Sequence, residues 1–357
     1  MVKLEDYSLT HIIRMTDDVG IFEHCIFATP DRLEGYCTDD NARALQLALR
    51  VKKESLVNTY LRFIVSARTP KGFHQDLKSD FTWRDDDGVN EGFGRAMAAL
   101  GEASISAPTD DQKLTAVFIF DKQAILIKDA REPRTIAQVI TGIFHRMKFE
   151  AANSNLVPLL VMRKKLEGNT LVGLSGNLEI ELIRLADRLT KFYLTNSSSS
   201  WKWYEDLITY DNGRLPLALF YAYQTTGNKK YLEVAKESLD FLIDKTYDNS
   251  KDYFSFPGYR GWFPKDGEKA LFGQQPIEAG SIVEVCSEVF KITKERKYLD
   301  FAKIALSWYS GKNILGISLI DKITCGIYDG LEPWGFNPNQ GAESTISYLL
   351  ARSSFES

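Results

Sequence analysis

One short segment gathers the densest set of side chains that could do acid–base chemistry. Residues 201–219 read WKWYEDLITYDNGRLPLAL, which brings Glu205, Asp206 and Asp211 close together around one helix start. Carboxylates held near one another repel, so the pKa of one is raised while another stays ionised. A proton donor and an ionised carboxylate are what cleavage of a glycosidic bond requires. We therefore predict catalytic or tight-binding roles for Glu205, Asp206 and Asp211.

A second candidate is the adjacent pair Asp39 and Asp40, which opens the segment DDNARALQLALRV. Consecutive side chains on a helix diverge by about 100°, so both carboxylates cannot cap the same helix and at least one is left to face a cavity. Both are predicted to be catalytic, and the sequence ranks neither above the other. A third group is Asp329 and Glu332, in IYDGLEPWGFNPNQGAE.

Aromatic rings, amides and further carboxylates surround these acids in the sequence. Sugars present hydroxyl groups that pair with carboxylates and amides, and C–H faces that stack on aromatic rings. This mixture suits a saccharide better than an apolar or phosphorylated ligand. The predicted substrate-binding residues are Trp83, Glu91, Arg134, Trp203, Tyr204, Tyr210, Arg214, Trp262, Gln275, Glu278, Asp329, Glu332, Trp334, Gln340 and Glu343.

Each of these residues also has a purely structural explanation. Asp is favoured at helix N-caps, so Asp39 and Asp211 could serve only as caps. Glu91, Glu278 and Glu343 could be first-turn acids that favour the positive end of a helix. The aromatic rings could simply cover the core. Because the acids recur at several helix starts, the functional interpretation is favoured.

The elements that would position these residues form a repeat of helical hairpins. Each unit has a polar loop, a helix rich in small and apolar residues, a short break and a conventionally amphipathic helix. Asp39, Asn90 and Asp211 suit an N-cap, and Pro133 and Pro276 suit a first helical turn. The first helices are predicted to begin near Asp39, Asn90, Pro133, Asn212, Pro276 and Gln340.

The amphipathic helices are predicted to form an outer ring, at 56–67, 111–127, 180–194, 230–247 and 296–309, with 8–19 closing it. If the inner helices all run in one direction, their first turns meet around one mouth. Two aromatic loops, 73–83 and 253–267, are predicted to form short hairpins at the rim. A stretch near 151–178 is additional. We expect one all-α domain over 1–357, an (α/α)6 toroid.

Composition excludes several other classes. The formal net charge of −4, with no run of basic residues, argues against a nucleic-acid partner. No stretch has the length and apolarity of a membrane span or a secretory signal, so a cytoplasmic protein is expected. The four cysteines are widely spaced and have no histidine at metal-ligand spacing, so neither a metal nor a disulfide framework is predicted.

Four blocks of the sequence resemble those of six-hairpin glycosidase-like proteins: GYCTDDNARAL, WYEDLITYDNGRLPLALF, GQQPIEAGSIVEVC and GFNPNQGAESTISYLLA. This superfamily includes unsaturated glucuronyl hydrolases, α-1,6-mannanases and N-acylglucosamine 2-epimerases. The resemblance implies an (α/α)6 barrel with a carbohydrate site where the inner helices begin. Its mannanase group places two consecutive aspartates at the catalytic centre, which implies such a role for Asp39 and Asp40. It also implies a functional association with a glycosyltransferase.

Three functions remain open. The first is a cofactor-free glycoside hydrolase acting on an oligosaccharide, with Asp40 or Glu205 as general acid and Asp211 or Asp206 as base. The second is a sugar epimerase or isomerase, which would use histidines in the cavity; the sequence argues against it because it puts His11, His24, His74 and His145 in an outer helix, in loops and at the far end of an inner helix. The third is a non-catalytic saccharide-binding partner of a glycosyltransferase.

Overall fold

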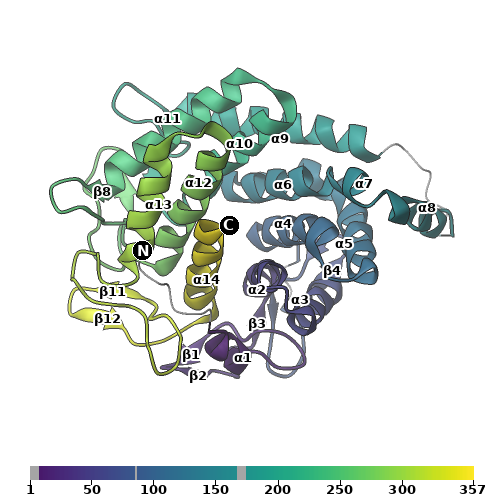
Figure 1. The fold of residues 1–357 in the computed structure, drawn as a ribbon, viewed down its shortest axis with the longest axis horizontal. Helices are drawn as coiled ribbons and strands as arrows, with labels where there is room; N and C mark the ends of the chain where they lie inside the picture. Colours follow the sequence, from purple (N-terminus) through teal and green to yellow (C-terminus); the bar gives the residue numbers. More distant parts are fainter. Residues whose placement is uncertain (1–7, 85–86, 167–173) are drawn as a thin grey trace.

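The inner wall of the molecule is a closed ring of six helices. The computed structural model describes residues 8–84, 87–166 and 174–357, so part of the predicted additional stretch lies outside the described residues. Each inner helix contacts the next, and the last contacts the first (Figure 1). The six are α2 (Thr38–Arg50), α4 (Glu91–Ser106), α6 (Pro133–Arg146), α10 (Arg214–Thr226), α12 (Pro276–Thr293) and α14 (Ala342–Glu356).

A second set of helices covers the outside of this ring, and each packs on the inner helix of its own hairpin (Figure 1). Their outward faces are charged and their inward faces apolar, as the amphipathic pattern predicts. They are α3 (Glu54–Ala67), α5 (Asp110–Gln123), α9 (Leu174–Asn196), α11 (Lys229–Thr246), α13 (Arg296–Trp308) and the short α1 (Thr10–Met15), which packs on α14. The all-α (α/α)6 toroid predicted from the sequence is confirmed.

The additional stretch between α6 and α9 lies beside the ring. It contains α7 (Phe149–Ala152), a short 3-10 turn η2 (Ser154–Leu156) and α8 (Val157–Leu166). Another 3-10 turn, η1 (Ala124–Asp129), extends α5, so the helix predicted over 111–127 is divided in two. A small apolar cluster, Val117 with Phe149, Leu156 and Leu160, ties this region to α5.

Short two-stranded ladders join the helices, and all are antiparallel. Two are hairpins, β4 (Arg68–Thr69) with β5 (Gly72–Phe73), and β8 (Tyr247–Asp248) with β9 (Tyr253–Phe254). Each lies at the start of an aromatic loop for which the sequence predicts a hairpin, and not within that loop. The ends of the two aromatic loops instead pair with distant segments: β6 (Asp76–Leu77) with β3 (Tyr36–Cys37), and β10 (Phe263–Pro264) with β7 (Leu207–Ile208). The remaining ladders are β1 (Cys25–Ile26) with β2 (Thr29–Pro30), and β11 (Gly330–Glu332) with β12 (Gly335–Asn337).

Helix starts fall within two residues of the predicted positions, but two predicted caps are wrong. Asn90 does cap α4, because its side chain accepts from Phe93 N–H. Asp39 lies inside α2, whose cap is Cys37, with Sγ accepting from Asp40 N–H. Asp211 precedes the Gly213 cap of α10 and has a left-handed backbone, with φ of 47°. Both aspartates are therefore free for tertiary contacts.

Close approach of α4 and α6 depends on two glycines. A Cβ at Gly101 would lie 2.2 Å from the carbonyl oxygen of Gly142, and a Cβ at Gly142 would lie 2.4 Å from that of Met97. Because backbone atoms of a packed helix cannot easily move aside, the two helices could not keep this distance with larger residues.

We expect Gly101→Ala to lower the free energy of unfolding by about 1–3 kcal/mol, since the overpacking outweighs the roughly 1 kcal/mol gain in helix propensity. Urea denaturation would measure it. Gly88→Ala is the control, because a Cβ there meets no atom within 4 Å. Equal stability of the two variants would contradict the packing argument.

Candidate active site

The first turns of the inner helices meet around one arginine. Arg95, on α4, donates from Nε to Asp39 Oδ2 at 3.2 Å, from Nη2 to Glu91 Oε1 at 2.5 Å and from Nη1 to Asp211 Oδ2 at 3.0 Å. These carboxylates belong to α2, to α4 and to the turn before α10. The Arg95 side chain is only 4% exposed. A guanidinium has donors in a fixed fork, so it can hold acids from three elements at once.

A second arginine links the starts of α2 and α14. Arg43 donates from Nη1 to Asp40 Oδ1 at 2.7 Å and forms an ion pair from Nη2 to Glu343 Oε2 at 2.8 Å. Asp39 and Asp40 therefore diverge, as their spacing predicts, and each is bound by a different arginine. Burial raises the pKa of Glu343, which Arg43 opposes.

A third arginine joins the start of α6 to the segment before α10. Arg134 donates to Glu205 Oε2 at 2.9 Å, to the carbonyl oxygen of Tyr210 at 2.7 Å and to Asn212 Oδ1 at 3.3 Å. Its guanidinium also lies 4.7 Å from the centroid of the Tyr210 ring. Tyr210 in turn donates from its hydroxyl to Glu91 Oε2 at 2.6 Å.

The start of α12 joins this set through Glu278, which accepts from Asp211 N–H and, at 2.6 Å, from Asn212 Nδ2. Side chains from the starts of all six inner helices are thus connected by direct contacts. We call this end of the ring the mouth. The expectation that the inner helices point their first turns toward one place is confirmed by these contacts.

Below the mouth, the ring interior is also charged. Arg214 donates to Glu284 Oε1 at 2.7 Å, and Arg50 lies 3.2 Å from Glu284 Oε2 and 3.4 Å from Glu102 Oε1. Burial alone would raise the pKa of Glu284, but the two arginines hold it below its usual range. The interior of the barrel therefore contains buried acids whose charge is balanced by arginines.

The acids of the mouth differ in protonation because their neighbours differ. Burial tends to raise the pKa of Asp211, yet Arg214 and Arg95 lower it below the ordinary value. The pKa of Glu91 is likewise lowered, because Arg95 and the Tyr210 hydroxyl outweigh burial. Burial raises the pKa of Asp39 despite Arg95. For Glu278, with no arginine bonded to it, burial raises the pKa to about 8.

Asp39 differs from its neighbours in its hydrogen bonding. Its Oδ1 is buried and has no hydrogen-bond partner among the described residues, although Oδ2 is bound by Arg95. Its side chain is 18% exposed, whereas that of Asp40 is 4% exposed. Asp39 is therefore partly accessible, but its unpartnered oxygen is the buried one.

Several residues predicted for the site lie elsewhere or are occupied by other contacts. Asp206 is 73% exposed and pairs with Lys265, outside the mouth network. Trp203 and Tyr204 are fully buried in the hydrophobic core, so the expectation that their rings meet a ligand is corrected. The Gln340 side chain is buried and bonds Thr324 and Asp321.

Other predicted rings lie at the rim or beside the site. Trp262 has its ring 6.0 Å from that of Tyr210 and so borders the mouth network. Trp83 is half-buried, stacked on His74 at 5.0 Å. Trp334 is 71% exposed, in the turn between β11 and β12, with the Arg260 guanidinium 5.4 Å from its ring.

The acids flanking β11 are held by loop contacts. Asp329 Oδ1 accepts from Gly341 N–H at 2.8 Å and from the Ser344 hydroxyl at 2.7 Å, at the start of α14. Glu332 is buried and pairs with Arg260 at 3.4 Å. Gln275 is the half-buried residue that directly precedes α12.

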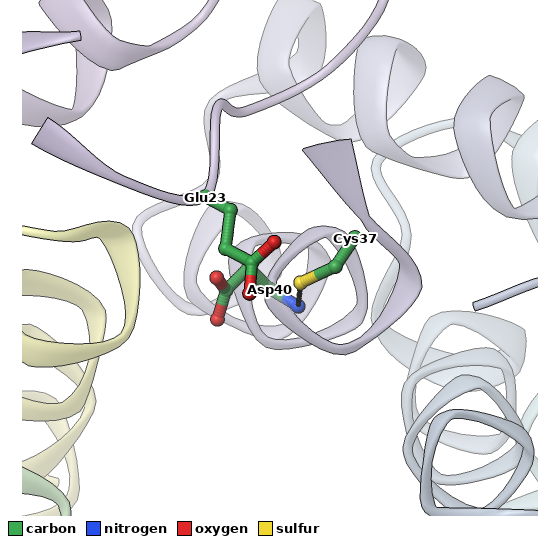
Figure 2. Close-up of side chains that lie close together, drawn as sticks. All are labelled: Glu23, Cys37 and Asp40. Carbon is green, nitrogen blue, oxygen red and sulfur yellow. Dashed lines mark hydrogen bonds between the residues drawn. The ribbon is translucent and has the colours of Figure 1, made fainter. Parts of the chain in front are cut away.

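Sequence reasoning missed Arg43, Arg95, Glu284 and Glu23. The two arginines carried a local signal, since Arg43 follows Asp40 by three residues and Arg95 follows Glu91 by four, which places each pair on one helix face. Glu23 had no such local signal in the sequence, because the residues beside it come from distant segments. It lies beside Cys37 and Asp40, with one oxygen of each acid and Sγ within 4.8 Å of one another (Figure 2).

This trio is the group of described side chains close enough to hold a metal ion together. However, Cys37 is fully buried, its pKa is raised well above the usual value by burial, and the guanidinium of Arg43 already occupies Asp40 Oδ1. A metal ligand would have to be a thiolate and would have to compete with this cation. The donor set therefore fits a metal poorly.

Among the described residues, no helix has the length and apolarity needed to cross a bilayer. All four cysteines are unpaired.

Comparison with known proteins places the fold. No protein-family model matches the chain, and no curated protein matches it in sequence. Among solved structures, the cellobiose 2-epimerase from Bacillus thermoamylovorans has a TM-score of 0.70 at 14% identity, covering 99% of this chain and 96% of that one. A D-mannose isomerase has a TM-score of 0.64 at 11% identity, with coverage of 97% and 95%.

A third similar structure is the α-1,6-mannanase from Salegentibacter, with a TM-score of 0.59 at 11% identity and coverage of 97% and 95%. That structure is an inactive variant, with two consecutive aspartates replaced by alanine, in complex with α-1,6-mannotetrose. At these identities the similarity establishes architecture alone. The chain has the six-hairpin (α/α)6 barrel fold of glycosidase-like proteins.

We expect Arg95→Met to lower the free energy of unfolding by about 3–5 kcal/mol, because Asp39 and Glu91 would lose their arginine partner and Asp211 one of its two in a largely buried place. Urea denaturation would measure the change. The matched control is Arg296→Met, whose exposed pair with Asp300 should contribute less than about 1 kcal/mol. Similar losses in the two variants would show that Arg95 does not organise the mouth.

Glu278 should make stability depend on pH. Its pKa of about 8 in the folded protein exceeds its unfolded value, so its stabilising effect is full below the unfolded pKa and is lost as the pH rises through about 8. We expect the melting temperature of the wild type minus that of Glu278→Gln to fall steadily from about pH 5 to about pH 8. A difference that stays constant or grows with pH would contradict this assignment.

Proposed function

We propose that this protein is a carbohydrate-active enzyme that hydrolyses a glycosidic bond of an oligosaccharide, with Asp39 and Asp40 as essential carboxylates. The observation that carries this proposal is the pair itself. Two consecutive acids open α2 at the mouth, a different arginine holds each, and the Asp39 side chain stays partly exposed. Asp211 and Asp206 are less suitable, because Asp211 is buried between two arginines and Asp206 lies outside the network.

The chemistry requires a base and a stabilised positive charge at the sugar. We assign the base to Asp39, whose carboxyl group is 18% exposed and whose raised pKa suits acceptance of a proton from an attacking water. Asp40, bound to Arg43, contributes a fixed negative charge beside it. Arg95 and Arg43 keep both carboxylates in place during the reaction.

The surroundings support a sugar ligand. Tyr210 and Trp262 offer aromatic faces next to the mouth acids, and Trp334 offers an exposed ring at the rim. The mannanase supports the assignment further, because that protein is described as inactive without two consecutive aspartates and binds a mannose oligosaccharide. The proposal does not include an association with a glycosyltransferase, since none of the structural neighbours named above is one.

We expect Asp39→Asn to reduce turnover by about 10²-fold or more, since general base catalysis contributes about 10²–10⁴-fold. Asp40→Asn should also reduce turnover, because the fixed negative charge beside the base is lost. Release of new reducing ends from α-1,6-mannotetraose, cellotetraose and a wider oligosaccharide panel would be measured. Asp206→Asn is the control and should stay fully active, because it is exposed and outside the mouth. Two folded, fully active variants would remove Asp39 and Asp40 from the mechanism.

A sugar 2-epimerase is the second candidate, and two observations favour it. The cellobiose 2-epimerases have the higher TM-scores among these neighbours, 0.70 and 0.69. In addition, His24 Nε2 lies 3.4 Å from Glu23 Oε1, so a histidine does approach the mouth acids. Incubation with cellobiose and mannose in deuterated water separates the candidates, because only an epimerase or isomerase introduces solvent deuterium at a sugar carbon. Binding of a sugar without either reaction would support a non-catalytic role.

A further inference from the structure

The backbone of Glu23 is fixed between two inner-helix starts. Its N–H donates to the carbonyl oxygen of Gly35 at 3.1 Å, in the segment that leads into β3 and α2. Its carbonyl oxygen accepts from Ala342 N–H at 3.1 Å, and Ala342 is the first residue of α14. A loop residue held in this way presents its side chain in one place relative to both helices.

The Glu23 side chain lies at the solvent side of Asp40. One oxygen of each carboxyl group and Cys37 Sγ lie within 4.8 Å of one another, and the two carboxyl groups lie side by side above the first turn of α2 (Figure 2). Glu23 is 31% exposed, whereas Asp40 is 4% exposed. Asp40 is bound to Arg43 through Oδ1, so its charge is fixed behind the accessible carboxyl group.

The charges that face Glu23 are mostly negative. Asp40 and Asp39 approach from α2 and Asp76 from β6, while His24, the next residue in the chain, opposes their effect on Glu23. Asp76 is itself balanced by Arg84 at 3.2 Å. Burial, followed by the charge of Asp40, raises the pKa of Glu23 to about 7. Near neutral pH this carboxyl group is therefore half protonated and reachable from solvent.

We infer that Glu23 is the proton donor of the proposed hydrolysis, positioned by Asp40. This inference rests on the function proposed above and completes it. The glycosidic C–O bond breaks with its electron pair on oxygen, and that oxygen takes the proton of Glu23. A water oxygen bonds to the sugar carbon and loses a proton to Asp39. Asp39 then releases to solvent the proton that it took from water, and Glu23 takes up a proton from solvent, so the net reaction consumes one water and releases two hydroxyl-terminated sugars.

A leaving group that needs no proton tests this role. The substrates are the panel oligosaccharide that the wild type cleaves best and the 2,4-dinitrophenyl glycoside of the same sugar. We expect Glu23→Gln to lower kcat on the oligosaccharide by about 10²–10⁴-fold but to change kcat on the dinitrophenyl glycoside by less than about tenfold. Glu34→Gln, at an exposed site in the same loop, should change neither.

The outcomes separate the two proposals. A wild type that cleaves neither substrate overturns the hydrolase and the role of Glu23 with it. If the wild type is active and Glu23→Gln lowers kcat equally on both substrates, or on neither, the role of Glu23 alone is overturned. Circular dichroism and the melting temperature confirm that the variant is folded, so a loss of activity is not a loss of structure.

A titration tests the positioning role of Asp40 without any substrate. The protein is labelled with carbon-13 at the glutamate carboxyl groups and studied by NMR. The Glu23 resonance is identified as the one that is absent from the spectrum of Glu23→Gln. We expect it to titrate near pH 7 in the wild type and at lower pH in Asp40→Asn, because a neighbouring negative charge has been removed. The inference is overturned if Glu23 titrates in the ordinary range for a glutamate, or if its pKa is the same in the wild type and in Asp40→Asn.

Discussion

The mouth of this barrel depends on the guanidinium of Arg95, which binds Asp39, Glu91 and Asp211. These acids come from separate parts of the chain, so one cation fixes the relative positions of α2, α4 and α10. A buried ion group of this kind adds little stability over an apolar core, but it is costly to break. It therefore defines a single arrangement of the helix starts.

The same arrangement gives acids of different character within one small region. Arginines keep Asp211 and Glu91 ionised, while Glu23 and Glu278 retain protons near neutral pH because burial outweighs their positive neighbours. Sites that do acid–base chemistry commonly separate carboxyl groups in this way. The Glu23 carboxyl group is also accessible and lies beside Asp40. In the mechanism that we infer, it donates its proton to the ligand.

The barrel does not by itself select a reaction. Neighbours with this fold include epimerases, an isomerase and glycoside hydrolases, and function belongs to side chains mounted on the common frame. In this chain the mouth is dominated by arginine-bound carboxylates. One histidine, His24, comes within 3.4 Å of one of these acids, whereas His145 is half-buried against the rings of Phe144 and Tyr221. The predominance of carboxylates over histidines at the mouth is why our proposal favours hydrolysis over epimerisation.

The sequence by itself determined the helices, their pairing in hairpins and the gathering of acids at inner-helix starts, because periodicity and start residues are local properties. It also placed Asp39 and Asp40 on diverging sides of α2. Only the tertiary structure decided that Trp203 is core, that Asp206 is outside the mouth, and that Glu23 stands beside Asp40. Burial and pairing between distant segments set those outcomes, and neither is encoded in the spacing of residues along one helix.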